Sequence, residues 1–159
     1  MRYWKISPGR GGKYWNDFKG LGFIAIFWQG IGDLRRFSSW GEIEDFFYRK
    51  KETPGSGWET AKAEYTCDQL WWFGYKMQVG DKVFAYSRKT ILGVGRIVGG
   101  YEFEKDDEFD FHYRPVDWIE LESKSVGNLP RDLQKKLRRQ VTIIDLSKHE
   151  GRQVMALYH

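Results

Sequence analysis

The chain has 159 residues, 41% of them hydrophobic and 30% charged, so it is long enough for a buried core and its composition excludes a disordered protein. Its single cysteine excludes an internal disulfide, and no apolar run approaches the roughly 20 residues of a membrane span or resembles a signal peptide, so we expect one cytoplasmic domain over residues 1–159. The net charge of +4 permits nucleic-acid binding without requiring it, and many of the 8 Trp, 9 Tyr and 11 Phe stand beside basic residues, as on surfaces that stack bases.

The amino-terminal part of the chain predicts two strands separated by a loop and a short helix. Alternating aromatic and basic residues indicate a strand over 2–7, which the glycine-rich loop 8–12 follows. Aromatic residues at helical spacing predict a helix over 13–19. The apolar run over 22–28 predicts a strand buried on both faces, which ends at an aromatic residue before a turn with two glycines.

Two serine–glutamate pairs predict the starts of two helices, because each pair has the spacing of a capping box. The pair at 39–42 predicts a helix that ends near residue 51, with an apolar face of Ile43, Phe46 and Phe47. The pair at 56–59 predicts a longer helix that ends near residue 76.

The second half of the chain predicts mainly antiparallel strands. A tight turn at 88–89 joins the expected strands 82–87 and 90–98, and Gly93 and Gly95 indicate sharp curvature or a close approach of another segment. The other expected elements are a loop or strand extension over 101–110, strands over 113–121 and 140–144, and helices over 130–139 and 147–158. These elements predict an α+β fold, a curved β-sheet or small β-barrel flanked by helices.

The sequence offers little for catalysis. Its three histidines and Cys67 are scattered, so no metal site is expected, and no nucleophile motif is present. The glycine-rich segment 8–13 lacks the spacing of a phosphate-binding loop. Asp117 with Glu122 and Lys124 resembles the metal-dependent nuclease pattern only weakly. We therefore expect a binding domain with no catalytic residues and no cofactor.

Base recognition is the chemistry that suits this composition, because an extruded base needs a stacking wall and a polar partner for its edge. Trp28 ends a strand at a glycine-rich turn, and the amide of Gln29 can both donate and accept hydrogen bonds. Tyr101 and Phe103 are candidates for a second wall. Trp15 and Trp58 are weaker candidates. For each aromatic residue, core packing is the alternative interpretation.

Basic residues in the predicted loops could hold a nucleic-acid backbone. The Arg88–Lys89 turn is the segment best placed to enter a groove, whereas the basic residues of 130–139 are expected on a solvated helix face. The candidates for backbone contacts are Arg10, Lys13, Arg35, Arg36, Arg88 and Lys89.

Taken in order, several segments resemble the amino-terminal domains of McrB-like restriction GTPases, which are similar to the EVE and YTH families of the PUA-like superfamily. The resemblance covers roughly residues 2–157. The segments that carry it are YWKIS at 3–7, GFIAIFWQGIGDL at 22–34, QLWWF at 69–73, VGDKV at 79–83, ILGVGRI at 91–97 and YRPVDW at 113–118.

This resemblance implies a PUA-like curved barrel with a pocket for a flipped, modified base, most readily N6-methyladenine in double-stranded DNA. Trp28 matches the position of one wall of the methyladenine cage in YTH domains, whereas the expected second wall at 101–111 has no clear match. The family also implies a GTP-hydrolysing AAA+ module, absent from these residues, and an McrC-type nuclease partner. Two alternatives remain: a reader of modified RNA with the same fold, and a protein-interaction domain with exposed aromatic residues.

Overall fold

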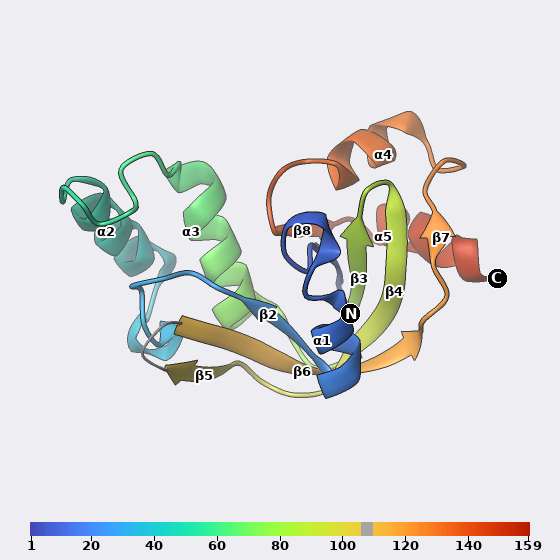
Figure 1. Ribbon diagram of the computed structural model, residues 1–159, viewed down its shortest axis with the longest axis horizontal. Coiled ribbons are helices and arrows are strands. Elements are labelled where there is room, and N and C mark those ends of the chain that lie inside the picture. Colours follow the sequence, from blue (N-terminus) through green and yellow to red (C-terminus); the bar gives the residue numbers. More distant parts are fainter. Residues whose placement is uncertain (106–109) are drawn as a thin grey trace.

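The computed structural model describes residues 1–105 and 110–159, and it has an α+β fold in which a curled, half-barrel sheet is flanked by helices (Figure 1). Within these residues the sheet has eight strands in the order β2-β6-β4-β3-β1-β8, with β5 paired to β6 and β7 to β4. The strands are β1 (Tyr3–Ile6), β2 (Phe23–Ile26), β3 (Lys82–Ser87), β4 (Thr90–Ile97), β5 (Glu102–Lys105), β6 (Asp110–Glu120), β7 (Lys124–Ser125) and β8 (Ile143–Leu146).

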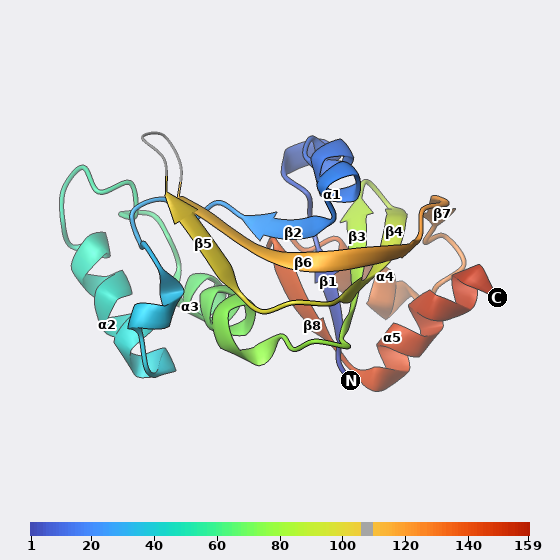
Figure 2. The ribbon, with the colours of Figure 1, turned by 90° about the horizontal axis from the view of Figure 1, so that it is seen from below.

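The helices gather at the two ends of the sheet and on both of its sides. Helices α2 and α3 lie at one end and α4 and α5 at the other, while Figure 2 shows α1 on the opposite side of β6 from α3 and α5. The helices are α1 (Trp15–Leu21), α2 (Trp40–Lys51), α3 (Ala63–Trp71), α4 (Arg131–Leu137) and α5 (Lys148–Met155).

Strand β1 separates two hydrophobic clusters, because its side chains alternate between the two faces of the sheet. Trp4 and Ile6 pack into the cluster that α1, α2 and α3 cover, and Tyr3 packs into the cluster that α4 and α5 cover. Lys5 stands on the same face as Tyr3. Strand β1 runs parallel to β3 and antiparallel to β8, so Lys5 lies opposite Phe84 and Ile144. A charged residue thus occupies a position where its neighbours are apolar.

The expected strands and helices are largely confirmed. Strand β3 has the predicted bounds, and the turn to β4 has Arg88 and Lys89 at φ values of 49° and 62°, the left-handed region that such a tight hairpin requires. Helix α2 begins after Ser39, whose side chain accepts from the backbone of Glu42, and ends at Lys51. Of the two alternatives for 101–110, a loop or a strand extension, the structure shows strand β5 over Glu102–Lys105, while residues 106–109 lie outside the described residues.

Three predictions about elements were wrong. The expected strand over 22–28 ends at Ile26, so Trp28 lies in the connection that follows β2 and not at the end of the strand. The expected helix over 59–76 begins only at Ala63, because the Ser56 and Glu59 side chains close a turn instead: Glu59 accepts from the Gly57 N–H at 2.7 Å. The expected strand over 140–144 begins at Ile143, so Gln140, Val141 and Thr142 remain in the connection that follows α4. All three errors leave irregular backbone where the sequence predicts regular structure.

Candidate ligand-binding cavity

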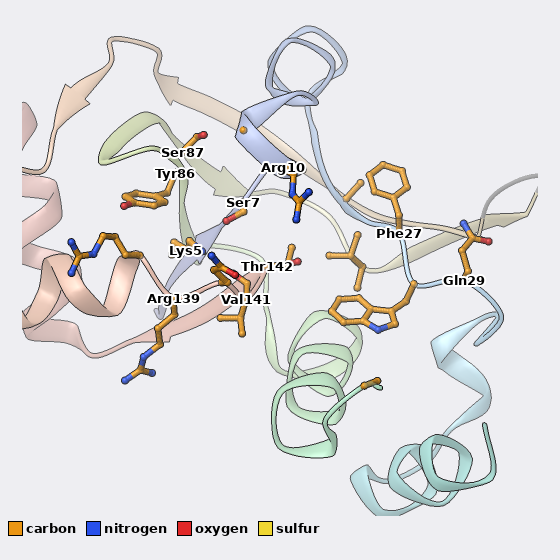
Figure 3. Close-up of a pocket in the computed structure, with 18 of the residues that line it drawn as sticks. Lys5, Ser7, Arg10, Phe27, Gln29, Tyr86, Ser87, Arg139, Val141 and Thr142 are labelled. Carbon is orange, nitrogen blue, oxygen red and sulfur yellow. The ribbon is translucent and has the colours of Figure 1, made fainter. Parts of the chain in front are cut away.

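A cavity of about 910 Å³ opens where strands β1, β2 and β3 end, a volume at the upper end of the range for ligand sites (Figure 3). The connection between α4 and β8 closes one side of it. Figure 3 shows Lys5, Tyr86, Arg139 and Val141 on one side and Phe27 and Gln29 on the other. The cavity therefore has two different sides, one aromatic and one cationic.

The aromatic side consists of the residues that follow β2 together with Trp58. Phe27, Trp28 and Gln29 all line the cavity. Trp58 is only 6% exposed, and its ring packs against Phe46 and Phe47 at centroid distances of 5.8 and 5.9 Å. Its indole N–H donates to the Gln29 carbonyl at 3.1 Å. Trp58 thus fixes the segment that carries Trp28 and also contributes its own surface to the cavity.

The turn after Gln29 is held by a buried carboxylate. Gly30 and Gly32 have φ values of 83° and 73°, a region that favours glycine. Their N–H groups donate to Oδ2 of Asp110 at 2.9 and 3.0 Å. Asp110 begins β6, so the turn is tied to the strand that pairs with β2 and β5. A turn anchored in this way positions Trp28 and Gln29 before any ligand binds.

A second set of hydrogen bonds reaches the same segment through His112. Its Nε2 donates to the Trp28 carbonyl at 3.4 Å, which leaves Nδ1 to accept from the Tyr101 hydroxyl at 2.7 Å. The Tyr101 oxygen accepts from the Leu34 N–H at 3.0 Å. Burial lowers the pKa of His112, so the neutral tautomer that this network requires is favoured.

The cationic side carries five basic residues and, among the lining residues that the structure describes, no carboxylate. Lys5 lies at the end of β1 and is 1% exposed; its ammonium donates to the Val141 carbonyl at 2.8 Å and lies 5.5 Å from the Tyr86 ring. In the described part of the chain none of the five forms an ion pair. The five are Lys5, Arg10, Arg88, Arg138 and Arg139.

Five of the predicted site residues meet in this cavity: Trp28, Gln29, Trp58, Arg10 and Arg88. The other aromatic candidates lie elsewhere. Tyr101 is 7% exposed and bound to His112 and Leu34, and Phe103 packs 5.0 Å from the His112 ring. Trp15 packs edge-on against Trp118 at 4.7 Å. None of these three is among the described residues that line the cavity.

The remaining basic candidates are also outside the cavity. Arg35 pairs with Asp33 at 2.8 Å, and the Arg36 guanidinium lies 4.7 Å from the Phe37 ring. Lys13 lies over the Tyr14 ring at 5.0 Å. Lys89 lines a smaller adjoining hollow of about 370 Å³ together with Tyr86, Arg88 and Arg138.

Sequence reasoning missed Lys5, Arg138 and Arg139. Lys5 lies in a strand that is predicted from alternating aromatic and basic residues, and a single lysine in such a strand belongs to no binding motif. Arg138 and Arg139 fall at the end of α4, where basic residues usually complement the helix dipole.

The described residues contain no group of three His, Cys, Asp or Glu side chains placed to hold a metal ion. Asp117 is exposed and pairs with Arg96 at 3.7 Å, and Glu122 pairs with Lys124 at 3.2 Å. Nor does any described helix combine the length and apolar character that a bilayer span requires.

The sequence matches the family described as Domain of unknown function (DUF8426) over residues 4–147. A comparison with curated proteins gives no match. The matched range contains every lining residue of the cavity and all of strands β2 to β8. The cavity therefore lies within the part of the chain that corresponds to the family.

Proposed function

The chain belongs to the family of the DUF8426 domain of unknown function, and from its cavity we propose that it is a DNA-binding domain that holds a flipped, modified base, N6-methyladenine first among them. In this proposal the base stacks on Trp28 at the aromatic side of the cavity, to which Trp58 also contributes, and Gln29 meets the edge of the base. The PUA-like fold that the resemblance implies is part of the proposal, and the curled half-barrel sheet is compatible with it.

One observation carries the proposal: a single cavity unites indole surfaces with five cations and, within the described residues, no carboxylate. Aromatic surfaces bind bases by stacking, at about 1–3 kcal/mol per base. Cations without carboxylate partners keep their charge available for a phosphate backbone and attract it over a distance. A nucleotide meets both demands, because it joins an aromatic base to a negatively charged phosphate.

The first test compares duplexes that carry one N6-methyladenine with unmodified duplexes of the same sequence. We expect the methylated duplex to bind more tightly, and Trp28→Ala to weaken its binding by about tenfold or more, because a stacked base is lost. Fluorescence anisotropy measures both affinities. The matched control is Tyr65→Ala, since Tyr65 is 49% exposed on α3 and lies outside the cavity lining.

The outcomes separate the alternatives. Equal affinity for the two duplexes contradicts the methyl preference, and tighter binding of the matching RNA identifies an RNA reader, because only RNA offers the 2′-hydroxyl. Binding that does not weaken with rising salt contradicts a nucleic-acid ligand altogether and favours a protein-interaction domain.

The attached AAA+ GTPase and the McrC-type nuclease partner belong to the same proposal, on the resemblance alone. The test is whether the natural gene also encodes a GTPase of the McrB type. A gene without such a module contradicts this part and leaves the base-binding proposal as it stands.

A further inference from the structure

Lys5 is a buried cation whose charge has no counterpart among the described residues. It is 1% exposed, and burial lowers its pKa to about 8. An ammonium has three N–H donors, and within the described residues its hydrogen bond goes to Val141 alone. That carbonyl is neutral, so it satisfies one donor without balancing the charge. Burial of an unbalanced charge is costly, and a structural role alone does not explain why the chain retains it.

The surroundings of Lys5 add further positive charge. Arg139 lies on the same side of the cavity, as Figure 3 shows, and Arg88 and Arg138 line the cavity and the hollow beside it. Arg88, Arg138 and Arg139 are exposed and solvated, so only the buried Lys5 lacks a counter-charge, and none of the described residues provides one. An anionic group of a ligand supplies it most directly.

The size of the cavity indicates which anionic group is meant. A volume of about 910 Å³ matches ligands of drug size, well beyond a single base, so a base against Trp28 leaves room at the Lys5 side. In a nucleic acid the group joined to a base through its sugar is a phosphate. The two sides of the cavity thus correspond to the two ends of one nucleotide.

We propose that Lys5, with Arg139 beside it, binds the phosphate of the nucleotide whose base stacks on Trp28. This inference rests on the proposed function and specifies its ligand: the cavity takes a whole nucleotide, and the phosphate is read from inside the cavity as well as at the surface. Lys5 then supplies a charged hydrogen bond, and its positive charge finds its counterpart when the nucleotide enters.

The direct test removes the charge either from the DNA phosphate or from Lys5. Methylated duplexes are prepared with a neutral methylphosphonate at the linkage on the 5′ or the 3′ side of the modified nucleotide. For the wild type we expect one of these linkages to weaken binding by about tenfold, the value of a charge-assisted hydrogen bond. Lys5→Met should bind the unaltered duplex about tenfold more weakly and show no further loss with the neutral linkage.

Salt dependence gives a second readout of the same contact. The slope of log affinity against log salt should fall by about 0.9 in Lys5→Met, the amount expected for one lost phosphate contact. Lys148→Met serves as the control, because Lys148 is exposed at the start of α5 and is not among the described residues that line the cavity. It should retain sensitivity to the neutral linkage.

Proton uptake provides a readout that a purely structural lysine would not affect. A bound phosphate raises the pKa of Lys5, so the wild type should take up a fraction of a proton on binding at pH 8.5, and Lys5→Met should take up less. Calorimetry in buffers of different ionisation enthalpy measures this difference. The other charged or titratable groups that line the cavity are Arg10, Tyr86, Arg88, Arg138 and Arg139.

The outcomes distinguish this inference from the function on which it rests. If the wild type binds methylated duplexes but ignores both neutral linkages, the phosphate site is wrong and the base-binding proposal stands. If Lys5→Met remains sensitive to the neutral linkage, Lys5 does not contact the phosphate and the inference is overturned. If no duplex binds, both fall together.

Discussion

Lys5 is proposed to favour ligand binding, but its buried charge should lower the stability of the folded chain. In the folded chain its pKa is about 8, against an ordinary value of 10.5, so holding the charge in the fold has a cost at neutral pH. We expect Lys5→Met to raise the free energy of unfolding by about 2 kcal/mol at pH 7, after allowance for the hydrogen bond to Val141 that is lost. Urea denaturation of both proteins measures the difference.

The pH dependence of this difference provides its control. Between pH 8 and pH 10.5 the unfolded chain holds the Lys5 proton more firmly than the folded chain. The free energy of unfolding of the wild type should therefore rise relative to that of Lys5→Met as pH rises. The advantage of Lys5→Met should therefore shrink across this window. An advantage that stays constant, or a variant less stable at pH 7, contradicts the cost assigned to the buried charge.

For single aromatic residues, the sequence could not separate core from cavity. Trp28 and Tyr101 both stand where regular structure gives way to glycines, and both were candidates for a wall. The difference arises from partners far away in the chain: the Tyr101 hydroxyl binds Leu34 and His112, whereas Trp28 lines the cavity. Such hydrogen bonds depend on the fold as a whole and leave no local pattern.

The turn that follows β2 offers a test of preorganisation. We expect Asp110→Ala to weaken binding of the methylated duplex several-fold, because the Gly30 and Gly32 N–H groups lose their acceptor and the segment of Trp28 becomes mobile. Asp110→Asn keeps an acceptor oxygen and should restore part of the affinity. Fluorescence anisotropy measures the affinities, and circular dichroism checks that each variant is folded.

Asp117→Ala is the matched control for this experiment. Asp117 is a carboxylate on the same strand, β6, but it is exposed and pairs only with the exposed Arg96 among the described residues. An equal loss of affinity in Asp117→Ala would show that the effect reflects the charge of β6 and not the anchored turn.

Elements with strong local signals were predictable, and those whose limits depend on tertiary contacts were not. The β3–β4 hairpin follows from alternation on either side of a two-residue turn, and α2 follows from its capping residues. The start of α3 was not predictable, because the Ser56–Glu59 pair caps a turn that packs Trp58 inward. The late start of β8 likewise depends on pairing with β1.

Two glycines of β4, Gly93 and Gly95, lie in close contact with neighbouring segments. A Cβ at Gly93 would lie 2.7 Å from the Trp15 ring and 2.8 Å from the Glu120 carbonyl oxygen. We expect Gly93→Ala to lower the free energy of unfolding by about 1–3 kcal/mol, since the backbone of Glu120 cannot yield without moving β6. Thermal and urea unfolding both measure this change.

Gly20→Ala is the control of opposite sign. Gly20 lies in α1, and no other segment of the described chain comes within 4 Å of the position that a methyl group would take there. Alanine should therefore stabilise the helix by about 1 kcal/mol. If both substitutions stabilise the protein, Gly93 is not required for the close approach of Trp15.

The fold class was within reach of the sequence, whereas the cavity as a whole was not. Alternating strands, turn signals and caps suffice for a curved sheet with helices outside. The five cations come from β1, the turn after it, the β3–β4 hairpin and the end of α4, and nothing local indicates that these segments converge. Only the strand order brings them together.

The position of β1 between β3 and β8 has a consequence for how the chain folds. Lys5 and Val141, whose contact forms part of the cavity, are 136 positions apart, and the parallel partner of β1, strand β3, begins only at Lys82. Contacts between such distant segments must overcome a large loop-closure entropy and form slowly. We therefore expect the cavity to be completed late in folding, after the local β3–β4 hairpin and the capped helices have formed.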